Sequence, residues 1–414
     1  MQTNLADWIK DTPEGIEADR ILRKCVHCGF CLATCPTYNL LGDELDSPRG
    51  RIYLMKQALE GEPVTEKTQL HLDRCLTCRS CETTCPSGVQ YGRLLDIGRE
   101  VVEKKVGRGL SASIKRTVLK HVLPQTGLFS AGLTVGRAVK AILPNALAKK
   151  IPAPRAAGLR PAPTHQRKML MLEGCVQPAM APSINAATAR VLDKLGISIV
   201  TASNVGCCGA IPHHLNDIDQ SHTFIKRNID AWWPHIEAGA EAIVVTASGC
   251  GTMVEEYGYI LRNDAWYAEK ARRVSELFRD VSQVVIAENA TLSKMLAAKQ
   301  HAPTKIAFHS PCSLQHGLKI KGVVESLLEG AGFELTPVPD GHFCCGSAGT
   351  YSLLQPELSQ QLLANKVNAL ESGAPQMVAT ANIGCLAHIE GALNASSMVP
   401  IRHWIELIDE RLAG

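Results

Sequence analysis

The stretch Cys25-Val-His-Cys28-Gly-Phe-Cys31-Leu-Ala-Thr-Cys35-Pro36 decides the fold of the amino-terminal part of this chain. It recurs as Cys75-Leu-Thr-Cys78-Arg-Ser-Cys81-Glu-Thr-Thr-Cys85-Pro86, with every cysteine displaced by the same 50 positions. Three cysteines spaced in this way wrap a loop around one 4Fe–4S cluster, and the fourth points to the other cluster. The sequence therefore predicts two clusters with interleaved ligands. Cluster 1 is assigned to Cys25, Cys28, Cys31 and Cys85, and cluster 2 to Cys75, Cys78, Cys81 and Cys35.

Other roles for these eight cysteines fit poorly. Zinc sites use paired C-x-x-C units with a longer gap between the pairs. A disulfide framework suits a short secreted chain rather than one of 414 residues. The amino terminus lacks the basic start and apolar run of a signal peptide. Sixteen cysteines without such a signal predict reduced thiols in the cytoplasm, kept for metal binding.

Composition predicts a soluble globular protein of two or three domains, with 45% hydrophobic and 20% charged residues. A net charge of +3 is too small to indicate nucleic-acid binding. No run approaches the roughly 18 apolar residues of a membrane-spanning helix.

Residues 111–149 predict an amphipathic helical pair packed on its own protein, with a membrane surface or a partner as alternatives. Prolines at 151–163 predict a linker.

Helical patterns surround both cysteine runs. Residues 12–24, the segment that begins at Pro48 and residues 88–105 all have helical spacing, which predicts a helical version of a two-cluster ferredoxin domain. Four arginines lie near the predicted cluster loops: Arg49, Arg51, Arg74 and Arg79. Arginine there can raise a cluster potential or dock an acidic partner, and a solvated or structural role is the favoured interpretation.

The second half is a tandem repeat. Cys175, Cys207, Cys208 and Cys250 recur as Cys312, Cys344, Cys345 and Cys385, at offsets of 137, 137, 137 and 135. Short apolar runs alternate with helical patterns at 183–195, 219–236, 319–330 and 357–371, which predicts βαβ units and parallel sheets. The cysteines then fall in loops at one sheet edge. Gly209 and Gly346 are expected to let the backbone approach a cluster closely.

Three roles remain open for these eight cysteines. They can ligate a further metal or iron–sulfur centre, act as redox thiols, or be structural. Four histidines lie close to them in the sequence: His213, His214, His309 and His342. We interpret these histidines as polar loop residues rather than ligands.

Motifs for organic cofactors are absent from the sequence. No G-x-G-x-x-G follows a predicted strand, and there is no Walker lysine loop or G-x-S-x-G elbow. We therefore expect no flavin and no catalytic residue on this chain, which is suited to passing single electrons.

The order of parts resembles the iron–sulfur subunits of bacterial glycolate oxidase. The resemblance lies in the two cysteine runs and in Asp46-Ser-Pro-Arg-Gly-Arg-Ile52, Gly174-Cys-Val-Gln-Pro178 and Asn204-Val-Gly-Cys-Cys-Gly-Ala210. The chain is also similar to lactate-utilisation proteins, the third subunit of anaerobic glycerol-3-phosphate dehydrogenase, and fused C and B subunits of heterodisulfide reductase. We expect an α+β / α/β chain with a helical ferredoxin domain (1–105), a connector (106–165) and two α/β cysteine-rich CCG domains (166–302 and 303–414).

The resemblance implies a complex with FAD-containing subunits that oxidise glycolate to glyoxylate. This chain would then pass electrons toward a quinone or other respiratory acceptor, in the cytoplasm or peripherally on the cytoplasmic face of the inner membrane. Heterodisulfide reductase ends its motif with C-x-x-C, but Ala247 and Asn382 stand where its first cysteine would be. The alternative functions are an iron–sulfur subunit of a lactate or glycerol-3-phosphate dehydrogenase complex, a catalytic disulfide reductase like heterodisulfide reductase, and a redox-responsive scaffold.

Overall fold

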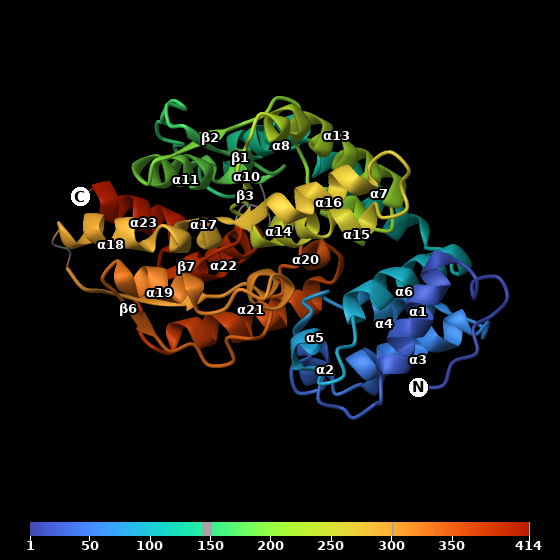
Figure 1. Cartoon of the computed structure of the whole chain (residues 1–414). Coiled ribbons are helices and arrows are strands. Elements are labelled where there is room, and N and C mark those ends of the chain that lie inside the picture. The colour runs from blue at the N-terminus through green and yellow to red at the C-terminus, as the bar shows by residue number, and fades with distance from the viewer. Residues whose placement is uncertain (143–150, 300–301, 414) are drawn as a thin grey trace.

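The computed structural model describes residues 1–142, 151–299 and 302–413. A helical domain lies at the amino-terminal end and packs against a pair of α/β domains (Figure 1). The helical domain contains α1 (Pro13–Lys24), α2 (Pro36–Leu41), η1 (Glu44–Asp46), α3 (Pro48–Leu59), α4 (Glu66–Asp73), α5 (Ser80–Thr84) and α6 (Tyr91–Lys105). The helical patterns expected around the two cysteine runs correspond to α1, α3 and α6.

Caps explain where the helices of this domain begin. The Thr12 side chain accepts a hydrogen bond from the Gly15 amide, and Ser47 does the same for Gly50. A proline follows each cap at the first helical position. Gly50 is needed for packing as well, because a Cβ there would lie 1.9 Å from the Glu44 carbonyl oxygen. The close approach of α3 to η1 therefore requires glycine at this position.

The connector forms α7 (Leu110–Val122), α8 (Thr126–Ala138) and η2 (Lys140–Ile142). Its ion pairs hold α7 to the protein, with Arg116 at 3.0 Å from Asp73. Leu110, Ile114 and Val118 recur every four residues and are 78%, 55% and 52% exposed. The prediction that this apolar side packs on its own protein is therefore wrong for α7. Residues 143–149 of the predicted pair lie outside the described residues.

The first α/β domain comprises β1 (Arg167–Leu172), α10 (Gln177–Met180), α11 (Pro182–Lys194), β2 (Ile197–Val200), α12 (Ala210–His214), α13 (Ile218–Glu237), β3 (Ile243–Val245), α14 (Ser248–Glu255), α15 (Tyr257–Ile260), α16 (Ala268–Leu277), β4 (Phe278–Asp280), α17 (Val281–Ala287) and α18 (Asn289–Ala297). The second comprises β5 (Thr304–His309), η3 (Ser313–Gly317), α19 (Val323–Gly330), β6 (Phe333–Thr336), α20 (Tyr351–Leu354), α21 (Pro356–Glu371), β7 (Met377–Thr380), α22 (Ile383–Ser396), β8 (Ile401–His403) and α23 (Trp404–Ala413).

Each α/β domain is built on a parallel four-stranded sheet. The strand orders are β2-β1-β3-β4 and β6-β5-β7-β8, so the two domains share one topology. Leu170 pairs with Ile243 in the first sheet, and Ile306 pairs with Met377 in the second. The order reverses beside β1 and β5, and such a switch point at the carboxyl ends of strands is where α/β sheets form sites. The predicted parallel sheets are confirmed.

The two α/β domains share a continuous apolar core. Buried side chains of both sheets belong to one contact cluster, which includes Trp232 and Trp404. The carboxyl-terminal helix α23 packs on α11 of the first domain. Among the described helices, none has the length and apolarity to cross a bilayer.

Candidate metal centres

The first candidate centre is a cavity beside the loop between α1 and α2. Its lining contains the four thiols predicted for cluster 1: Cys25, Cys28, Cys31 and Cys85. Pro48, Ile52 and Val89 supply apolar walls. Three of the thiols come from the loop of the first run, and Cys85 reaches across from the second run. This crossing is what the interleaved assignment requires.

The second candidate centre lies beside the first. Its lining contains the four thiols predicted for cluster 2: Cys35, Cys75, Cys78 and Cys81. Pro48, Cys81 and Tyr91 line both cavities, so the two sites are neighbours. The four predicted thiols in each cavity, with Cys81 also lining the first, fit a pair of 4Fe–4S clusters, which supply one-electron redox chemistry when bound. The assignment of individual ligands stays a prediction.

The two cysteine loops have the same backbone turns. His27 and Thr77, which lie at matched positions, both have φ of 54°. Two residues further on, Gly29 has φ of 88°, and Arg79 has φ of 58°. This left-handed region costs glycine little but strains a residue that has a Cβ. Arg79 therefore holds a strained conformation where the first loop uses glycine.

Burial makes the Cys31 and Cys81 thiols of these loops reluctant to ionise. Desolvation raises the pKa of Cys31 to about 11, and nearby Cys25 adds to the effect. Desolvation raises the pKa of Cys81 well above its ordinary value as well. Because clusters are ligated by thiolates, loading each site must release protons.

The arginines near the loops form ion pairs. Arg51 and Arg74 lie 3.0 and 2.9 Å from the two carboxylate oxygens of Asp46, which is fully buried. Arg49 pairs with Glu44 at 2.5 Å on the surface. The interpretation that the arginines near the loops have a structural role therefore holds for Arg49, Arg51 and Arg74. Arg51 also lies 4.0 Å from the Cys35 sulfur, so its charge faces the second cavity.

The structure brings together all four cysteines of each α/β domain. In the first domain, the thiol of Cys175 contacts that of Cys207, and Cys208 contacts Cys207 and Cys250. In the second, Cys312 and Cys344 lie 3.7 Å apart, Cys344 contacts Cys345, and Cys345 contacts Cys385. The sequence repeat is therefore also a repeat of sulfur clusters at the sheet edge.

The glycines after the paired cysteines approach helices. Gly209 and Gly346 have φ of 90° and 87°, as only glycine readily adopts. A Cβ on Gly346 would lie 2.6 Å from the Ser359 carbonyl oxygen of α21. The Gly209 carbonyl accepts a hydrogen bond from Ser221 at 3.0 Å, and Gly346 accepts one from Ser359 at 2.9 Å. The structure therefore shows a close approach of Gly209 and Gly346 to the backbone of a helix.

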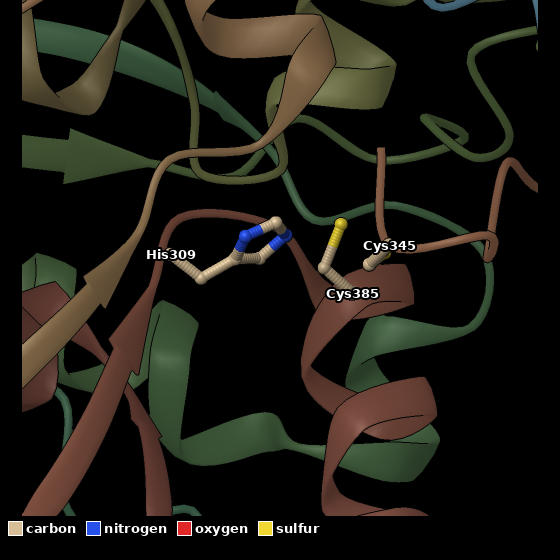
Figure 2. Close-up of side chains that lie close together, drawn as sticks. All are labelled: His309, Cys345 and Cys385. Carbon is tan, nitrogen blue, oxygen red and sulfur yellow. The ribbon is translucent and has the colours of Figure 1, made fainter. Parts of the chain in front are cut away.

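The four histidines have different surroundings. His213 lies 3.4 Å from Asp96 of α6, and His214 is exposed. Burial opposes the charge of His213, but Asp96 offsets this and raises its pKa. His342 is half-buried and lines a cavity with His309. The interpretation as a polar loop residue is wrong for His309, which ends β5 (Figure 2) and is 1% exposed, and for His213 and His214, which lie in α12.

The second centre of the helical domain faces the second α/β domain. Leu76, Cys344 and Tyr351 belong to one buried apolar cluster, against which Cys78 and Cys312 pack. A predicted cluster 2 ligand thus lies beside a cysteine set that is more than 200 residues away in sequence.

Polar contacts hold the helical domain to both α/β domains, because Glu256 belongs to the first and Tyr351 to the second. Arg79 pairs with Glu256 at 2.6 Å, and the Tyr351 hydroxyl donates to the Arg74 carbonyl at 3.1 Å. Sequence reasoning missed Glu256 and Tyr351, because no local pattern marks a contact between domains. Asp46 did have a local signal, since it lies beside two arginines in the quoted stretch Asp46–Ile52.

Comparison with known families matches the same three regions. Residues 21–89 match a 4Fe-4S dicluster domain, and residues 169–255 and 306–390 each match a cysteine-rich domain. The chain is therefore an iron–sulfur protein.

Several curated proteins are similar to this chain. The glycolate oxidase iron-sulfur subunit of Escherichia coli is 56% identical over 413 residues, which is 100% of this chain and 99% of that protein. A probable glycolate oxidase iron-sulfur subunit of Bacillus subtilis is 30% identical over 89% of this chain and 88% of its own length. Lactate utilization protein A of Bacillus licheniformis is 24% identical over 59% of this chain and 100% of its own length.

Proposed function

The chain belongs to the family of glycolate oxidase iron–sulfur subunits, and on this premise we propose that it carries electrons within a glycolate-oxidising complex. FAD-containing subunits oxidise glycolate to glyoxylate, and this chain passes the electrons one at a time toward a quinone or other respiratory acceptor. It works in the cytoplasm and contributes no group to the oxidation of glycolate itself.

The observation that carries this proposal is the pair of adjoining thiol cavities. Cys81 and Tyr91 line both, so Cys81 would lie beside a cluster held in either cavity. The first cavity lies near the surface, where Val26 and Phe30 are 69% and 65% exposed. An electron from an external donor can therefore enter at one centre and move to its neighbour.

The test is anaerobic reduction of the full chain by its partners. The chain is mixed with the flavoprotein subunits that co-purify with it, glycolate is added, and loss of visible iron–sulfur absorbance is followed. We expect bleaching with glycolate in the mixture, and no glycolate-dependent dye reduction by the chain alone. Turnover by the isolated chain, or no bleaching in the mixture, would contradict the proposal.

Lactate is the second candidate substrate of the complex. The observation that favours it is the similarity to lactate utilization protein A, which extends over the whole of that protein. The same mixture decides between the two when it receives D-lactate in place of glycolate. Glycerol-3-phosphate serves as a third substrate in the same comparison.

We also propose that α7 contacts a membrane surface. Its exposed apolar stripe of Leu110, Ile114 and Val118 has the exposed Lys115 beside it, as in helices that lie on anionic lipid. The other cations of α7, Arg116 and Lys120, pair with Asp73 and Asp217 and hold the helix to the protein. Co-sedimentation with anionic vesicles is expected, and Ile114→Ser with Val118→Ser should abolish it. If that variant binds the vesicles as well as the unaltered protein does, α7 is not the membrane-binding surface.

A further inference from the structure

Tyr91 lies where the two candidate centres of the helical domain meet. It is the first residue of α6, is 4% exposed and lines both thiol cavities. Its hydroxyl lies 3.6 Å from the sulfur of Cys75, which lines the second cavity. A tyrosine hydroxyl keeps its proton at neutral pH, so it donates a hydrogen bond to this sulfur. The polar atom of this buried side chain is therefore directed at a predicted ligand of the second centre.

The first cysteine run has no matching hydroxyl. The repeat of 50 positions aligns Tyr91 with Leu41, whose side chain has no donor and is 37% exposed. Among the described residues, no side chain donates a hydrogen bond to the predicted thiols of the first cavity. The second cavity also has the Thr37 hydroxyl, at 3.4 Å from the sulfur of Cys35. The two centres therefore have the same cysteine spacing but different polar surroundings.

The partner of Tyr91 differs from those of the other buried tyrosines. Tyr257 donates to the Cys208 carbonyl at 2.8 Å, and Tyr351 donates to the Arg74 carbonyl at 3.1 Å. Such bonds to the backbone satisfy a buried hydroxyl and hold the fold. In the described part of the chain, the hydroxyl of Tyr91 has the Cys75 sulfur as its only hydrogen-bond partner. The contact is therefore suited to act on the sulfur rather than on the backbone.

We propose that Tyr91 raises the reduction potential of the second iron–sulfur centre through its hydrogen bond to Cys75. The proposal rests on the electron-carrying function proposed above and on Cys75 as a ligand. Reduction adds one electron to the centre, which makes its thiolate sulfurs better acceptors. A donor to such a sulfur stabilises the reduced form more than the oxidised form. Tyr91 acts through the ligand, so it is a positioning residue.

The burial of the second centre explains why such a donor is useful there. Leu76 and Cys78 pack against Tyr351 of the second α/β domain, which covers this cavity. A buried site disfavours the added negative charge of the reduced form, because water no longer stabilises it. The hydrogen bond from Tyr91 offsets part of this cost. An electron that enters at the exposed first centre can then move to the second.

The test is an anaerobic redox titration of the full chain with both centres loaded, followed by electron paramagnetic resonance. The signal that changes in the Cys78→Ser protein identifies the second centre. Tyr91→Phe keeps the ring and removes the hydroxyl. We expect its second centre to be about tenfold harder to reduce, which is a fall of about 59 mV for one electron. The potential of the first centre should not change.

Tyr351→Phe is the matched control, because it removes another buried hydroxyl beside the same cavity, one that donates to a backbone carbonyl. It should leave both potentials unchanged. Equal shifts in the Tyr91→Phe and Tyr351→Phe proteins, no shift in the Tyr91→Phe protein, or a shift of the first centre alone would overturn the proposal.

A second substitution keeps the test decisive even if Tyr91→Phe fails to hold its iron. Incorporation of 3-fluorotyrosine at position 91 gives a more acidic phenol, which is a stronger donor. The potential of the second centre should then rise, and a fall or no change overturns the proposal. The titration uses neither glycolate nor flavoprotein subunits, so its outcome is separate from whether the complex oxidises glycolate.

Discussion

Replacing Arg51 with methionine should destabilise the helical domain far more than replacing Arg49. Arg51 is 1% exposed and donates to the His71 carbonyl at 2.7 Å and to Thr37 at 3.0 Å. Its third partner is the buried carboxylate of Asp46, at 3.0 Å. Arg51→Met fills a similar volume but leaves these acceptors without their donor.

The size of the loss in folding free energy depends on which charge is left unpaired. Removing one member of a buried ion pair typically costs about 3–5 kcal/mol. Arg74 still holds the other oxygen of Asp46 at 2.9 Å, so we expect the low end, about 3 kcal/mol. Arg49 and Glu44 are 35% and 45% exposed, so Arg49→Met should cost less than about 1 kcal/mol.

Redox potential provides a second readout of the same change. At 4.0 Å from the Cys35 sulfur, a unit charge contributes up to about 4 kcal/mol at an effective dielectric constant of 20. The Asp46 charge cancels most of this, so about 1 kcal/mol remains. That energy corresponds to a fall of about 40 mV in the one-electron potential of the second centre when Arg51 is replaced.

The assay is anaerobic denaturant unfolding followed by visible absorbance and circular dichroism, with variants compared at equal iron content. Asp46→Asn added to Arg51→Met should recover part of the lost stability, because it removes the unpaired carboxylate. If Arg51→Met and Arg49→Met unfold at the same midpoint, the buried ion-pair argument is wrong.

Three other predictions follow from contacts described above. The Cys85→Ser protein should have the same electron paramagnetic resonance spectrum as the Cys28→Ser protein and should keep about four of its about eight irons. A spectrum that matches that of the Cys78→Ser protein would contradict the interleaved ligands. Glu256→Gln should lower stability by about 1–2 kcal/mol through loss of the half-buried pair with Arg79, whereas Glu241→Gln, which disrupts the exposed pair with Arg167, should change little. His213→Gln should lower the stability of the protein below pH 6.5, because the charged imidazole of His213 attracts Asp96. This loss of stability should become smaller as the pH rises through the raised pKa of His213. A difference in melting temperature that does not depend on pH would refute this prediction.

Local patterns predicted the loops because each loop is specified by its own residues. The repeat of 50 residues places His27 and Thr77 at equivalent turns, and both have the same left-handed backbone. The parallel sheets were predictable for a similar reason, since short apolar runs alternate with helical patterns. The contact of Arg79 with Glu256 joins residues 177 positions apart, and no local signal specifies such a pair. The sequence offset does pair His309 with Leu172, but only the fold shows that His309 is buried beside two thiols.

Two nearly identical cysteine motifs thus occupy unequal positions in the folded chain. The first loop exposes Val26 and Phe30 at its surface, so an external protein can contact it directly. The second loop buries Leu76 against Tyr351, and its cavity is covered by the second α/β domain. The proposed carrier of single electrons needs one centre that its partner can reach, and the exposed first motif meets this need. The surface that surrounds each motif, rather than the motif itself, therefore sets its place in the proposed path of electrons.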